Sequence, residues 1–129
     1  MTPSPLLRFA LRLDGVASVA VGLLACLGLG AAATALGAPR AAIFGTGVFC
    51  VGYGAMAFWL GSRPFLRRTP IRAIALGNGL WAAGSVALGY SGWLAPTSIG
   101  LALLLAQAAA VAVFAGLQYV GLRQSLAAA

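Results

Sequence analysis

The sequence has no glutamate, no histidine and no lysine, and Asp14 is its only acidic residue. A chain without histidine and with one carboxylate lacks the acid, base and nucleophile sets on which most hydrolytic and proton-transfer enzymes depend. The same shortage removes the usual metal ligands, and no glycine-rich loop carries a lysine for phosphate. We therefore expect no catalytic residue, no metal site, no cofactor and no enzymatic activity.

Cysteine is also scarce, with only Cys26 and Cys50. Both lie inside apolar runs, and their spacing is not that of a CxxC motif. Free cysteines in such surroundings usually act as small apolar side chains. This interpretation is favoured over a disulfide or a shared metal ion.

Apolar residues are abundant instead. Hydrophobic residues make up 62% of the 129 positions, charged residues 7%, and the mean hydropathy is +1.02. A water-soluble domain of this length could not bury so much apolar surface, and the composition is typical of integral membrane proteins. The sequence therefore predicts a membrane protein.

Prolines and arginines divide the chain into four apolar runs, each close to the 20 or so residues that a bilayer requires. Pro39 and Pro96 mark two of the boundaries, and two prolines in an arginine-rich loop over residues 62–70 mark the third. The predicted fold is all-α, a single transmembrane domain over residues 1–129 that forms a four-helix bundle. Its helices are expected over residues 6–37, 41–61, 71–90 and 97–122.

Arginine placement predicts the orientation. With both termini in the cytoplasm (N-in/C-in), Arg40 alone would lie outside, and the positive-inside rule is strongly satisfied. The net charge of +7 is then explained by topology and by contact with the anionic headgroups of the bilayer, with no nucleic acid as partner. A sequence rich in Ala, Gly and Arg and without Lys is typical of bacteria with GC-rich genomes. It therefore predicts that the membrane is a bacterial inner membrane. The predicted cytoplasmic set is Arg8, Arg12, Arg63, Arg67, Arg68, Arg72 and Arg123.

Asp14 is the residue most in need of an explanation, because a carboxylate in an apolar helix is costly. At 1.5 Å per residue, Asp14 lies about 3 Å beyond Arg12, Asn78 about 9 Å beyond Arg72, and Gln118 about 7.5 Å before Arg123. These similar depths allow a polar cluster if the helix faces converge. One interpretation is a polar pocket or a proton-linked site. The favoured one is interhelical bonding, in which Asp14 pairs with Arg12, Arg72 or Arg123 and the amides bond across helices. The candidate cluster is Asp14, Ser18, Asn78, Trp81, Gln118 and Tyr119.

Four short helices, a lone carboxylate in the first and a tryptophan in the third superficially resemble the small multidrug resistance transporters. That resemblance implies a dimer in which Asp14 exchanges protons for cationic drugs. The motifs Leu11–Asp14, Asn78…Trp81 and Leu117–Tyr119 are also similar to small bacterial four-helix membrane proteins without an assigned role. At greater distance the plan resembles DoxX-type four-helix proteins. These similarities imply a location rather than an activity.

Three functional hypotheses follow. Small-residue stripes such as Ser18–Gly22–Cys26 and Thr46–Cys50–Gly54 favour a non-catalytic accessory protein that packs with itself, as a homo-oligomer, or with another membrane protein. Asp14 and the nearby amides favour the alternative of a small proton-coupled transporter. Trp81 and Tyr119 favour a third, a lipid- or quinone-binding membrane protein. Trp81 lies far from either end of its run, so we expect it to pack against another helix.

Overall fold

The computed structural model describes residues 1–129 as five α-helices without strands. Four of them are long and apolar enough to cross a membrane, which confirms the all-α class and the number of long apolar helices expected from the sequence. The fifth is a short helix between the first two long ones. The helices are α1 (Pro5–Leu27), α2 (Leu29–Leu36), α3 (Arg40–Gly61), α4 (Arg68–Tyr90) and α5 (Ser98–Ala127).

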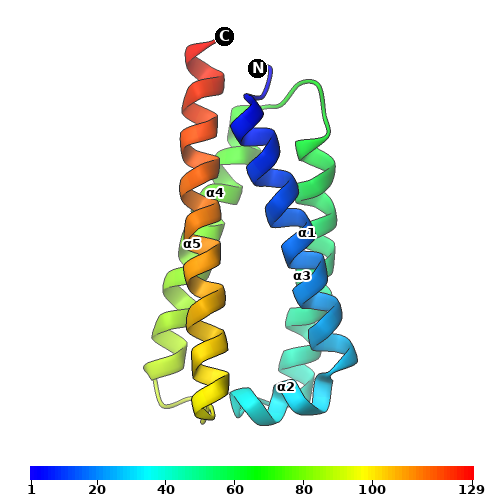
Figure 1. The fold of residues 1–129 in the computed structure, drawn as a ribbon, viewed down its shortest axis with the longest axis vertical. Coiled ribbons are helices and arrows are strands. Elements are labelled where there is room, and N and C mark those ends of the chain that lie inside the picture. Colours follow the sequence, from blue (N-terminus) through cyan, green and yellow to red (C-terminus); the bar gives the residue numbers. More distant parts are fainter.

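The segment 6–37, predicted as one helix, is divided at Gly28 into α1 and α2. The φ and ψ angles of Gly28 are −97° and 34°, outside the helical range, and α2 then runs across the end of the molecule (Figure 1). The Gly28 nitrogen still donates to the Leu24 carbonyl at 2.8 Å, so α1 is complete up to this glycine and the chain turns after it. Gly37, with φ 60°, ends α2 in the left-handed conformation that glycine adopts without strain.

The arginine-rich loop is shorter than predicted, because α4 begins at Arg68 rather than at residue 71. Pro70 thus lies in the first turn of α4, where its missing N–H removes no helical hydrogen bond. Residues 62–67 remain as the connection between α3 and α4. At the other end of the chain, α5 continues past the predicted boundary at residue 122 to Ala127.

The long helices form two pairs, α1 with α3 and α4 with α5 (Figure 1). The pairs meet through α1 and α5 at the end of the molecule where both termini lie, and they diverge toward the other end. There α2 packs against both α3 and α5. Helices α3 and α4 do not approach each other closely along their backbones. The four long helices are therefore packed in the order α3–α1–α5–α4.

The most extensive packing is between α1 and α3, where Gly15 and Gly54 face each other. A Cβ atom added to Gly15 would lie 2.7 Å from the Gly54 carbonyl oxygen, and one added to Gly54 would lie 2.8 Å from the Val19 nitrogen. These neighbours are backbone atoms and cannot move aside. Small residues at such crossings allow two helices to approach closely in lipid.

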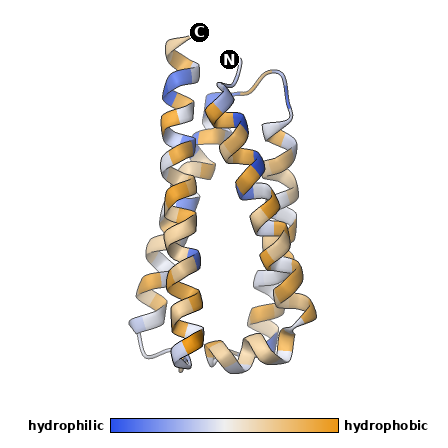
Figure 2. Cartoon of the chain, in the orientation of Figure 1, coloured by the Kyte–Doolittle hydropathy of each residue, from blue (hydrophilic) through white to orange (hydrophobic).

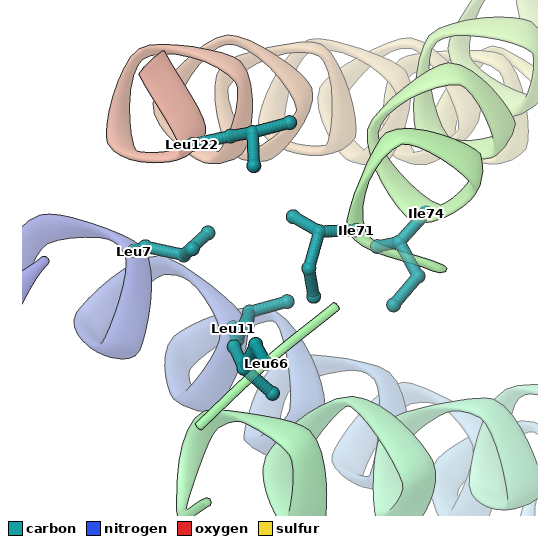
Figure 3. Close-up of a cluster of buried hydrophobic side chains, with 6 residues drawn as sticks. All are labelled: Leu7, Leu11, Leu66, Ile71, Ile74 and Leu122. Carbon is teal, nitrogen blue, oxygen red and sulfur yellow. The ribbon is translucent and has the colours of Figure 1, made fainter. Parts of the chain in front are cut away.

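The buried apolar core lies at the end that holds both termini. Six side chains from α1, the α3–α4 connection, α4 and α5 pack together there (Figure 3). Hydrophilic residues also gather toward this end, whereas the rest of the chain is mostly apolar (Figure 2). The core residues are Leu7, Leu11, Leu66, Ile71, Ile74 and Leu122.

Ser4 ties the start of α1 to the end of α5. Its hydroxyl accepts from the Leu7 nitrogen at 3.1 Å, which caps α1, and donates to the Gly121 carbonyl at 2.9 Å. The Ser4 nitrogen donates to the Ser125 Oγ at 2.8 Å. At the opposite end the Thr97 nitrogen donates to the Ala35 carbonyl at 2.9 Å, so α5 is fixed at both of its ends.

Candidate functional site

The buried polar site is centred on Asp14, whose side chain is 1% exposed. Its Oδ2 accepts hydrogen bonds from the Tyr53 hydroxyl at 2.6 Å, the Gln118 Nε2 at 2.7 Å and the Asn78 Nδ2 at 2.8 Å. Its Oδ1 accepts from the Ser18 hydroxyl at 3.2 Å. One carboxylate thus joins side chains from α1, α3, α4 and α5.

The partners of Asp14 are also bonded to one another. Asn78 Nδ2 donates to the Gln118 Oε1 at 3.0 Å, and Asn78 Oδ1 lies 3.0 Å from the Tyr53 hydroxyl. Tyr53 has one hydroxyl proton, which is shared between Asp14 and Asn78. No buried side-chain nitrogen or oxygen in the molecule lacks a partner. The network is therefore closed, a condition under which buried polar groups make a fold rigid and specific.

The directions of these bonds fit an ionised carboxylate, which accepts and does not donate. All four donors to Asp14 are neutral, and no arginine is among them. Arg12, the nearest arginine in sequence, instead donates through Nε to the Gly61 carbonyl at 3.1 Å. The expected ion pair with an arginine is thus absent, and every hydrogen-bond partner of Asp14 is a neutral side chain.

The structure brings together four of the six predicted cluster residues, Asp14, Ser18, Asn78 and Gln118. Trp81 lies outside the network, where it stacks on Phe49 at 5.9 Å between ring centroids and donates from Nε1 to Gln107 at 3.1 Å. Its packing against another helix, expected from its position, is confirmed. Tyr119 is 56% exposed and makes no hydrogen bond to the cluster.

Tyr53 is the member that the sequence analysis missed. It lies ten residues before Arg63, about 15 Å at 1.5 Å per residue, which is deeper than Asn78 and Gln118 lie from their own arginines. The depth argument therefore does not select it. A tyrosine this far from a helix end is off the usual interfacial belt, and that position was the available signal.

The seven arginines predicted to share one side do lie at one end of the molecule, at the start of α1 and α4, near the end of α5, and in the loop between α3 and α4. Arg40 begins α3 at the opposite end. The Arg63 guanidinium lies 4.0 Å over the Trp59 ring. With Asp14 engaged by neutral donors, none of these cations has an acidic partner in the chain.

The arrangement can hold one negative charge, or one proton on it, between four helices. No three His, Cys, Asp or Glu side chains gather in a way that could hold a metal ion. Both cysteines are free and half-buried.

Comparison with known proteins gives no match, since no family model, no curated protein and no solved structure aligns with the chain. The resemblances drawn from the sequence stay predictions.

Proposed function

We propose that the chain is a multi-pass protein of the bacterial inner membrane, with both termini in the cytoplasm, that has no catalytic role and packs with itself or with another membrane protein. Four long apolar helices support the location, and seven arginines at one end against one at the other support the orientation. In this arrangement the hydrogen bonds to Asp14 hold the four long helices together.

The observation that carries the packing proposal is the outer face of α4. A Cβ atom added to Gly77 or Gly84, seven residues apart, would meet nothing within 4 Å. Leu76 and Leu80 on the same helix are 68% and 75% exposed. In lipid an exposed leucine needs no partner, but outward glycines serve close approach of another helix. The glycines of α1 and α3 described above are already used within the chain, whereas those of α4 are not.

Helix α3 offers a matched comparison. Gly45 and Gly52 are also seven residues apart and face open space, and exposed bulky residues stand beside them, as Leu76 and Leu80 stand beside the glycines of α4. The two helices differ in their neighbours, because α3 already packs against α1 and α2 whereas α4 packs against α5 alone. We therefore assign the packing surface to α4.

The test is extraction of tagged protein from its own membrane in a lipid-preserving copolymer, followed by mass spectrometry of the intact particle. A second copy or a stoichiometric partner is expected for the natural chain and for the Gly45→Leu/Gly52→Leu variant. The Gly77→Leu/Gly84→Leu variant should give a lone chain. A lone natural chain, or equal losses in both variants, would overturn the proposal.

A proton-coupled transporter is the second candidate, favoured by one observation. Asp14 is buried in an apolar segment without a cationic partner, and ionisable residues so placed often lie on ion pathways. The expected result is a proton released when substrate binds purified protein in detergent, lost in Asp14→Asn and kept in Ser18→Ala. Unchanged release in Asp14→Asn would rule the transporter out. The quinone alternative has less support, because Trp81 and Tyr119 do not take part in a common site.

A further inference from the structure

We propose that the outer face of α1 holds one anionic phospholipid, with its phosphate at Arg8 and Arg12 and an acyl chain along the groove below them. This inference rests on the proposed membrane location. The site is distinct from the buried Asp14 network and from the packing face of α4.

The cationic end of the site is formed by Arg8 and Arg12, one helical turn apart on α1. They line one open groove of about 470 Å³ together with Pro5, Phe9, Leu13 and Val16. The hydrogen bond from Arg12 Nε to the Gly61 carbonyl fixes that guanidinium and leaves its two terminal amino groups free. The Arg8 guanidinium makes no hydrogen bond within the chain. Two arginines on one face thus present unused donors, the arrangement that binds phosphate oxygens.

The apolar part of the site continues from the same residues. A second open groove of about 450 Å³ shares Val16 with the first and is lined mainly by apolar side chains of α1 and α3. Its other residues are Gly15, Val19, Ala20, Leu23, Ala55 and Phe58. The two grooves therefore form one track, which begins at two cations and becomes wholly apolar.

The length of the track matches one bilayer leaflet. From Arg12 to Leu23 α1 rises about 16 Å at 1.5 Å per residue, and half of a hydrocarbon core is about 15 Å. A phosphate at the arginines would place an acyl chain beside Val16, Ala20 and Leu23 and end it near the membrane centre. An acyl chain is thus the occupant whose dimensions fit.

Charge excludes a second copy of this chain as the occupant. The only acidic residue is Asp14, which is buried and engaged by four donors, so another copy would bring arginines and no acid to Arg8 and Arg12. A zwitterionic lipid supplies a phosphate but also a cation beside it. An anionic phospholipid brings a net negative charge to the two arginines, with no cation beside its phosphate.

The test counts lipids bound to the purified protein by mass spectrometry in mild detergent, with phosphatidylglycerol and phosphatidylcholine as probes. We expect one tightly bound phosphatidylglycerol on the natural chain and about tenfold weaker binding to Arg8→Gln/Arg12→Gln. The matched control, Arg68→Gln/Arg123→Gln, removes two arginines from the same end and should bind as the natural chain does. Ala20→Phe, which fills the track without changing a charge, should also weaken binding.

Three results would overturn the site. Equal losses of phosphatidylglycerol binding in the two double variants would mean that all arginines at this end attract lipid and that no specific site exists. Unchanged binding in Ala20→Phe, with competition by inorganic phosphate, would mean a simple anion site. Equal binding of the two lipids would mean that the groove is filled by any acyl chain. Failure of the proposed membrane location is seen separately, as protein released from membranes by alkaline carbonate.

Discussion

At the scale of single residues, Asp14 determines how the interior of the molecule is bonded. Its Oδ2 accepts from three neutral donors and its Oδ1 from one, so the two oxygens are not equivalent. An amide at this position can keep its oxygen toward the three donors and turn its NH2 group toward Ser18, whose hydroxyl also accepts. A methyl group can do neither.

Replacing Asp14 should therefore destabilise the protein in a fixed order. Asp14→Asn loses only the charge-assisted strength of the bonds, about 1 kcal/mol. Asp14→Ala leaves the Gln118 Nε2 without its acceptor, while the hydrogen bond between Tyr53 and Asn78 remains. We expect this variant to lose about 2 kcal/mol of stability. Thermal unfolding in detergent, followed by circular dichroism, measures both. The control is Thr34→Ala, which removes only an exposed hydrogen bond. Equal losses of stability in Asp14→Asn and Asp14→Ala would contradict the expected order.

Tyr53 offers a second prediction, since its ring and its hydroxyl have separate contacts. The ring stacks on Phe49 at 6.2 Å between centroids, and the hydroxyl bonds Asp14. Tyr53→Phe should cost about 1 kcal/mol, the value of one buried hydrogen bond, and Tyr53→Ala about 3 kcal/mol because the packing is lost too. The same unfolding measurement distinguishes them. Equal losses would show that the hydroxyl carries nearly all of the effect.

At the scale of helices, the α1–α3 crossing allows a comparison of glycines in opposite surroundings. Gly15→Ala would place a methyl group against the backbone of Gly54 and Phe58 and should lower stability by at least about 2 kcal/mol. Gly79→Ala on α4 meets nothing within 4 Å and should be neutral or stabilising by up to about 1 kcal/mol. Unfolding midpoints in one detergent give the difference. A tolerated Gly15→Ala would mean that the helices are not held this closely.

Helix positions were predictable from hydropathy and proline, because apolar length and the cost of breaking a helix are both local properties. The division at Gly28 was not, since glycines occur throughout the run and no local feature distinguishes this one. Arg68 as the start of α4 was missed for another local reason, as Pro70 is tolerated in a first turn. Asn78 and Gln118 were found from their depth along the helices. To exclude Trp81 and Tyr119 from the cluster one must know which way each helix is rotated about its axis, and residue spacing alone does not give that rotation.

At the scale of the whole molecule, charge is distributed along one axis. Removing the four arginines at positions 63, 67, 68 and 72 leaves three at one end and one at the other, so the bias that orients the chain should weaken. A cysteine placed at Ser91, with Cys26 and Cys50 replaced by alanine, reports orientation through a membrane-impermeant thiol reagent. The fraction of the cysteine at position 91 that is labelled from outside should fall from nearly all to an intermediate value, because the variant inserts in both orientations. An unchanged result would show that other features fix the topology.

The joining of the two ends of the chain has a consequence for biogenesis. In the proposed membrane location the helices enter the bilayer in turn. Asp14 then has Ser18 as its first hydrogen-bond partner, gains Tyr53 with α3 and Asn78 with α4, and gains Gln118 only with α5. The hydrogen bonds between Ser4 and the last turns of α5 also form only at the end of synthesis. A chain that stalls early would thus hold Asp14 in lipid without most of its donors.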